Sequence, residues 1–285
     1  MKKRITEIIL IACTLCSCNG ADDDKTSVSN EDPLANNAEW ELAWSDEFDK
    51  GTVNLAEWSY QKRQEDECNM YLTSRSELYE AGDGYLGLRG MVNTIDPADT
   101  ASYLCGGIET KNKVTFGKGM IEVRAKITGA VGPGAYGAWP AIWMLPNDDR
   151  ITIHNPGGAE IDIIERYAYN SYVNQTVHTY YTYTLGYKTP ANTAKGNILN
   201  GDWNVYGVEI GDNAVTFYVN GVATFKYPRI TTSFAGQYPF DELEYYLILD
   251  MQLGGDDGGM GAGPIIDDTL PVEMAIDWVR YYTKK

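Results

Sequence analysis

The chain has 285 residues with 23 basic and 40 acidic side chains, which gives a formal net charge of −17. Apolar residues make up 44% and charged residues 22%, the balance of a globular rather than a disordered protein. So negative a charge repels phosphate backbones and anionic lipid surfaces, which argues against nucleic-acid binding. The 21 Tyr and 7 Trp residues suit both β-rich surfaces and sugar-binding surfaces, and composition does not separate the two.

The beginning of the chain predicts export. A basic start precedes an apolar run at residues 8–15, far shorter than the roughly 20 residues that span a bilayer. Residues 15–18, Leu-Cys-Ser-Cys, resemble the cleavage box of bacterial lipoproteins, whose cysteine becomes the lipidated N-terminus. We therefore expect residues 1–17 to be a lipoprotein signal peptide and Cys18 to be the only membrane anchor. The alternative is an ordinary signal peptide that is cut nearby.

The residues after Cys18 predict a tether and a surface location. The acidic run at residues 22–24 resembles the export signal of surface lipoproteins in Bacteroides-like bacteria. It predicts an outer-membrane lipoprotein that faces the cell surface, with the periplasmic face as the alternative. Residues 18–38 are rich in Asp, Asn, Ser and Ala and predict a flexible tether. Residues 39–285 contain no repeat or later linker, so we expect one folded domain and a monomer.

Two cysteines, Cys68 and Cys105, remain in the expected domain. In an oxidising compartment such a pair suits a disulfide. Two separate buried thiols fit the sequence equally well, because the sequence does not give the Cα separation that a bridge requires. Neither cysteine has a second Cys or a His at ligand spacing, which argues against a zinc site.

Strand patterns dominate the expected domain. Residues 119–129 alternate in period two, with charged Glu122, Arg124 and Lys126 on the face opposite the apolar side chains. A strand at 215–219 is followed by Asn-Gly, a type I′ turn signal, and by a returning strand at 222–227. Further apolar segments lie at 203–210, 247–249 and 274–282. Because no long stretch has the helical period, helices should be few and short. The sequence predicts an all-β fold, a β-jelly-roll sandwich of two antiparallel sheets.

The segment with candidate chemistry is residues 160–165, Glu-Ile-Asp-Ile-Ile-Glu. On a regular strand Glu160 and Asp162 share one face and Glu165 points to the other. One extra residue, a β-bulge, would bring Glu165 back to the first face. Such a row of acids suits glycoside hydrolysis, in which one carboxylate attacks the anomeric carbon and another protonates the leaving oxygen. The alternatives are an exposed edge strand with scattered acids, or a calcium site.

Aromatic residues and a histidine flank these acids in the sequence. Trp139 and Trp143 lie shortly before them in a Trp-Pro-Ala-Ile-Trp-Met-Leu run and are candidates for sugar-stacking walls. His178, one of two histidines, lies on what we expect to be the neighbouring strand. A core or surface histidine without a functional role is the alternative.

These motifs together resemble glycoside hydrolase family 16. Residues 160–165 match its pattern E-[IL]-D-x-x-E. Supporting matches lie at residues 44–48, 106–110, 116–119, 139–145, 217–221 and 276–281. The resemblance implies a β-jelly roll with an open cleft and an endo-acting, retaining β-glycanase that requires no cofactor. It also implies that Glu160 is the nucleophile, Glu165 the acid/base and Asp162 their assistant.

The resemblance extends to binding residues. Trp139, Trp143 and His178 would line the cleft, and Asn69 corresponds loosely to a sugar-contacting position of the family. Members often carry a structural calcium, for which Glu47 and Asp277 are the candidates here.

The substrate is less sharply defined by the sequence. Laminarinase-type members carry Trp-Pro-x-x-Gly before the first catalytic Glu, and this chain has Asn-Pro-Gly-Gly-Ala at residues 155–159. Residues 175–181 and 250–252 also differ from the glucanase pattern, which favours β-galactoside-containing chains such as galactans, agar-like polymers or poly-N-acetyllactosamine. Arg166, as a local positive charge, and Gln252 are further substrate-binding candidates.

Two alternatives remain for the function. One is an endo-β-1,3(4)-glucanase. The other is a non-catalytic surface glycan-binding protein, because jelly rolls also serve as lectins. The intact pair Glu160 and Glu165 argues against a lectin, which needs no such pair.

Overall fold

The computed structural model of the chain describes residues 32–35, 37–50, 52–64, 70–82, 84–254 and 262–285. The expected signal peptide and tether up to residue 31 lie outside this range, as do Cys18, Cys68 and Asn69, so the predictions on them stay predictions. None of the helices in the described part of the chain is both long and apolar enough to cross a membrane.

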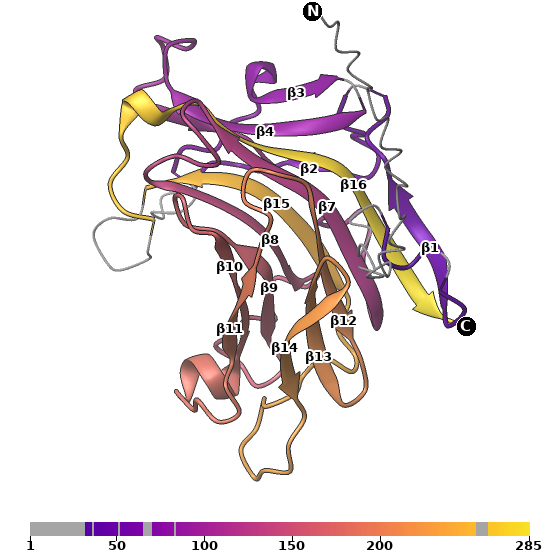
Figure 1. Cartoon of the computed structure of the whole chain (residues 1–285). Helices are drawn as coiled ribbons and strands as arrows, with labels where there is room; N and C mark the ends of the chain where they lie inside the picture. Colours follow the sequence, from indigo (N-terminus) through magenta and orange to yellow (C-terminus); the bar gives the residue numbers. More distant parts are fainter. Residues whose placement is uncertain (1–31, 36, 51, 65–69, 83, 255–261) are drawn as a thin grey trace, which may run out of the picture.

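The described residues fold into two antiparallel sheets, which Figure 1 shows as curved layers. The seven-stranded sheet has the order β11-β10-β9-β8-β15-β6-β2. Its strands are β2 (Ser59–Tyr60), β6 (Gly107–Glu109), β8 (Ala138–Pro146), β9 (Ala159–Glu165), β10 (Tyr172–Thr179), β11 (Thr193–Asn197) and β15 (Tyr245–Leu253). This sheet carries all the candidate catalytic residues.

The nine-stranded sheet has the order β14-β13-β12-β7-β16-β4-β3, with β1 paired to β16 and β5 paired to β4. Its strands are β1 (Trp40–Asp46), β3 (Tyr79–Gly82), β4 (Tyr85–Val92), β5 (Tyr103–Cys105), β7 (Gly119–Gly129), β12 (Asn204–Ile210), β13 (Ala214–Val219), β14 (Val222–Pro228) and β16 (Val272–Lys284). Helical turns are short in the described part of the chain: η1 (Ser76–Leu78), η2 (Tyr180–Thr184) and η3 (Asp267–Thr269). The predicted helix-poor sandwich of two antiparallel sheets is confirmed.

Local sequence signals account for much of this architecture. The alternating segment forms β7 with the predicted bounds, and its apolar side chains, such as Val123, are buried in the core between the sheets. The predicted hairpin joins β13 to β14 through Asn220 and Gly221, both with positive φ (51° and 74°), as a type I′ turn requires. The alternation of side chains along a strand and the positive φ that a turn requires depend on neighbouring residues in the chain. Both can therefore be predicted from the sequence.

Glu122 departs from its predicted exposure. It is only 2% exposed, although period two places it on the outer face of β7. On that face Trp40, Met120 and Tyr282 form a second apolar cluster against which Leu34 packs. Burial, with Asp32 nearby, raises the pKa of Glu122 to about 8. The outer face of the sheet is thus partly covered by residues near the start of the described chain.

Candidate active site

The predicted β-bulge is present in β9. On the β8 side Ile142 pairs with Ile164 and Trp143 pairs with Asp162, so that Ile163 has no opposite residue. The extra residue turns Glu165 to the face that Glu160 and Asp162 share. The isoleucines of the segment are all buried in the core, and this burial fixes the strand while the acids face outward.

Strand register gathers the candidate residues on one face of the seven-stranded sheet. Residues directly opposite one another in adjacent strands point to the same face. Glu160 is opposite His178 on β10, and Asp162 is opposite Trp143 on β8. Glu165 lies between Asn174 on β10 and Ala141 on β8. We call this surface the polar face; its residues are Gln61, Glu109, Trp139, Ala141, Trp143, Glu160, Asp162, Glu165, Asn174, Thr176, His178, Asp250 and Gln252.

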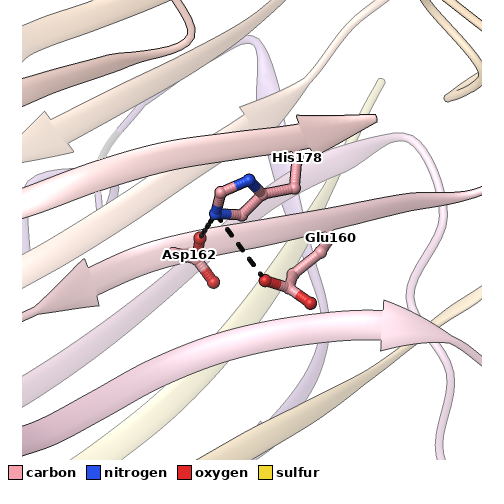
Figure 2. Close-up of side chains that lie close together, drawn as sticks. All are labelled: Glu160, Asp162 and His178. Carbon is pink, nitrogen blue, oxygen red and sulfur yellow. Dashed lines mark ion pairs between the residues drawn. The ribbon is translucent and has the colours of Figure 1, made fainter. Parts of the chain in front are cut away.

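Figure 2 shows that Glu160 and Asp162 reach toward the His178 ring from the adjacent strand. His178 Nε2 lies 3.5 Å from Asp162 Oδ2 and 3.9 Å from Glu160 Oε1. Burial, with Lys188 nearby, lowers the pKa of His178 to about 4, so the imidazole is neutral at neutral pH. Burial and the charges of Glu160 and Glu165 raise the pKa of Asp162, which favours its protonated form. A protonated Asp162 can donate a hydrogen bond to a carboxylate nucleophile.

The carboxyl groups of Glu160 and Glu165 are both buried, and each affects the protonation of the other. Burial, with Glu165 nearby, raises the pKa of Glu160 to about 7. Burial also raises the pKa of Glu165, against the effect of two hydrogen bonds that it accepts at 3.0 Å from Trp139 Nε1 and Tyr167 Oη. Two carboxyl groups that repel each other in a buried site share a proton at neutral pH. One can therefore act as a carboxylate while the other acts as an acid.

The two predicted indole walls differ in exposure. Trp139 is 6% exposed, and its N–H is directed at Glu165, so its clearest contact is with the acid. Trp143 is half-buried and donates to Asp250 Oδ2 at 3.2 Å. Trp143 therefore offers more ring surface to a sugar than Trp139 does. Gln252 lies opposite Trp139 on β15, as expected for the polar face, although it is only 4% exposed.

The prediction that Arg166 binds substrate is wrong. Its side chain is 0% exposed and donates hydrogen bonds to Pro133 O, Asn170 O and Asn200 Oδ1. It follows Glu165 directly, so it lies next to the acid in sequence, yet it points into the protein and ties three loop segments together. Sequence adjacency to the catalytic motif gave no information on this direction.

Replacing Arg166 with leucine should lower the free energy of unfolding by at least about 3 kcal/mol, because three buried acceptors lose their donors. The measurement is chemical denaturation followed by tryptophan fluorescence. An Arg150→Leu variant is the matched control, since Arg150 is exposed and pairs with Asp148 only locally. A loss as small as that of the control would contradict a structural role for Arg166.

The two predicted calcium ligands each have an arginine partner. Glu47 forms a two-contact ion pair with Arg280, and Asp277 pairs with Arg124. These ion pairs do not test a calcium site, in which backbone oxygens would supply most of the ligands, so the calcium prediction for Glu47 and Asp277 stays a prediction. Within the described range, the group of acidic and histidine side chains with metal-ligand spacing is Glu160, Asp162 and His178, which are catalytic candidates.

Cys105 is a buried free cysteine whose pKa is raised by burial. Cys68 lies outside the described residues, so the disulfide and the alternative of two separate thiols both stay predictions.

Sequence reasoning missed two polar residues of this site. Tyr167 donates to Glu165, and Asp250 is a fully buried acid within β15. An acid inside an apolar strand was the signal that singled out residues 160–165. Applied to 245–253, the same signal would have found Asp250.

Comparison with known proteins identifies the family. The family model described as "Glycosyl hydrolases family 16" matches residues 52–279. The chain belongs to this family. The predicted resemblance is thus confirmed, and with it the expectation of a glycoside hydrolase.

Two relatives and one solved structure show the range of the family. A keratan-sulfate endo-1,4-beta-galactosidase of Sphingobacterium multivorum is 34% identical over 86% of this chain, which spans 55% of that protein's length. A beta-glucanase of Rhodothermus marinus is 29% identical over 99% of this chain and 96% of its own. One solved structure comes from a description of endo-acting O-glycanases that prominent members of the human gut microbiota express to initiate mucin breakdown. It has a TM-score of 0.70 at 29% identity, and the match covers 85% of this chain and 98% of that one.

Proposed function

We propose that this protein is an endo-acting β-glycoside hydrolase that works with retention of configuration by double displacement. The observation that carries the proposal is the bulge in β9, which places Glu160, Asp162 and Glu165 on one face of the sheet. Glu160, whose side chain is 24% exposed, is the nucleophile that attacks the anomeric carbon. Glu165 protonates the leaving oxygen and then deprotonates the water that releases the product.

Asp162 assists Glu160 as the negative charge on that nucleophile is lost in the attack and regained in the hydrolysis. Its raised pKa favours the protonated form, which can donate a hydrogen bond to the Glu160 carboxylate before that carboxylate attacks and again after it is released. Neutral His178, 3.5 Å from Asp162, helps to hold that side chain in place without neutralising the acids. No cofactor takes part in these steps.

For the substrate we propose a β-galactoside-containing glycan, such as a galactan, an agar-like polymer or a poly-N-acetyllactosamine chain. Support comes from residues 155–159, 175–181 and 250–252, which differ from the glucanase pattern, and from the 34% identity to the keratan-sulfate enzyme. A cavity of about 650 Å³ at the β2 end of the sheet, lined by Ser59, Gln61 and other residues, gives room for further sugar units. Such room favours cleavage inside a chain.

An endo-β-1,3(4)-glucanase is the second candidate, favoured by the nearly full-length match to the Rhodothermus marinus beta-glucanase. We also propose that a lipid on Cys18 holds the enzyme at the outer membrane, facing extracellular polymers. The lipoprotein-like residues 15–18 support this location.

A digestion panel tests the substrate proposal. The protein without residues 1–18 is incubated with galactan, agarose, poly-N-acetyllactosamine, laminarin and mixed-linkage glucan, and the products are read by mass spectrometry. We expect an oligosaccharide ladder from a galactoside polymer and none from the Glu160→Gln control. A ladder from the glucans alone would replace the proposal with the second candidate. Binding without cleavage by the wild type would favour a lectin.

A further inference from the structure

Asp250 is a buried carboxylate on the polar face that the proposed hydrolysis does not use. It lies on β15, opposite Gly107 on β6 and Ala141 on β8, and it is 0% exposed. Ala141 is in turn opposite Glu165 on β9. Asp250 and Glu165 thus occupy one cross-strand row and are separated by a single small side chain.

Three N–H groups surround the Asp250 carboxylate. Trp143 Nε1 donates to Oδ2 at 3.2 Å and Gln252 Nε2 donates to Oδ1 at 3.1 Å. The amide of Gln61 also hydrogen-bonds it. A carboxylate without its proton accepts all of these bonds, whereas a protonated one would direct a hydrogen at one of the donors. The arrangement therefore favours the ionised form and fixes the direction of the Trp143 indole.

Asp250 and Glu165 interact electrostatically across the row, and the charge of Glu165 contributes to the raised pKa of Asp250. Two strand spacings separate their backbones, which is about 9.6 Å. Ala141, which lies between them in the row, is 3% exposed and Asp250 is 0% exposed, so little water screens the pair. A negative charge at this place opposes the loss of a proton from Glu165.

Other ionisable groups near Asp250 do not reverse this effect. Those that interact with it electrostatically are Glu165 of β9, Tyr79 of β3 and Cys105 of β5. Glu109 and Lys111, on and after β6, and Glu160, Asp162 and His178 complete the charged or titratable groups on the neighbouring strands. Burial raises the pKa of Asp250 to about 7 against the effect of its three hydrogen bonds. Its charge thus grows through neutral pH, where a general acid must keep its proton.

We propose that Asp250 is a positioning residue with two effects: it fixes the Trp143 indole as a sugar platform, and its charge helps Glu165 to retain the catalytic proton. The inference rests on the proposed roles of Glu165 and Trp143. It gives a buried acid outside the family's motif a part in setting the pH range of the reaction.

Two variants separate the two effects. Asp250→Asn removes the charge in nearly the same volume, and the alkaline limb of the pH profile of kcat/KM should move to lower pH by about half to one pH unit. Trp143→Phe keeps the ring and the Asp250 charge but removes the N–H donor. It should raise KM and leave the alkaline limb in place. Asp202→Asn, the same chemical change at an exposed loop site, is the control and should match the wild type.

The reciprocal titration tests the coupling without changing Asp250. In Glu165→Gln, Asp250 should titrate at a lower pH than in the wild type, as followed by ¹³C NMR of aspartate carboxyl groups. An unmoved alkaline limb in Asp250→Asn, or an unmoved Asp250 titration in Glu165→Gln, would overturn the coupling. An unchanged KM in Trp143→Phe would overturn the platform. If the wild type cleaves no glycan, the proposed function fails, and the NMR titration still decides whether the two acids are coupled.

Discussion

Replacing Glu160 with glutamine should reduce turnover by at least about 10⁴-fold and change glycan binding by only a few fold. The amide is nearly isosteric but has no negative charge with which to attack the anomeric carbon. Glu160 lies opposite His178 on β10, and its contact with this neutral imidazole, at 3.9 Å, does not depend on its charge. Turnover is measured as reducing ends released from the substrate polymer, and binding is measured by calorimetry with an oligosaccharide. Parallel loss of both, with the circular dichroism unchanged, would contradict the role.

Chemical rescue distinguishes the nucleophile from the acid/base. In Glu160→Ala, azide can enter the vacated space and attack the anomeric carbon of an activated β-glycoside, which yields an α-glycosyl azide after one inversion. In Glu165→Ala the glycosyl-enzyme still forms, and azide then attacks it to yield the β-azide after two inversions. The anomeric configuration is read from the proton NMR coupling constant. A β-azide from Glu160→Ala would exchange the two assigned roles.

Part of the fold and site followed from short-range sequence signals. The alternation in residues 119–129 and the Asn220-Gly221 turn depend only on residues that are neighbours in the chain. The corresponding strands are present as predicted. The bulge was predictable because three acids and three isoleucines between 160 and 165 cannot separate onto two faces of a regular strand. In each case the determining residues are close together in the chain.

The predictions that failed concerned side chains whose surroundings come from distant segments of the chain. Glu122 has the pattern of a solvent-facing residue, but Trp40 and Tyr282 cover that face of β7. Arg166 was predicted to contact substrate because it follows Glu165 in the sequence. Its hydrogen-bond partners Pro133 and Asn200 lie more than thirty residues away in either direction. Neither the alternation of residue types nor closeness in the sequence predicts which distant segment covers a side chain.

Replacing Glu165 with glutamine should have an effect that depends on the leaving group. On a natural glycan we expect a loss of about 10³-fold or more, because the departing sugar oxygen needs a proton and glutamine has none to give. With an aryl glycoside whose phenol leaves as a stable anion, formation of the glycosyl-enzyme needs no proton, so the loss in that first step should be far smaller. The measurement compares kcat/KM for the two substrates in the wild type and in Glu165→Gln.

The pH dependence gives the same variant a second readout. Burial raises the pKa of Glu165, so the wild-type acid stays protonated at pH values where an exposed glutamate, with a pKa of about 4.3, is ionised. Activity should therefore fall as pH rises through the raised pKa, and this alkaline limb should be absent from Glu165→Gln on the aryl substrate. The acidic limb, which reports protonation of the nucleophile Glu160, should remain. An alkaline limb that survives in Glu165→Gln would mean that another group on the polar face supplies the proton.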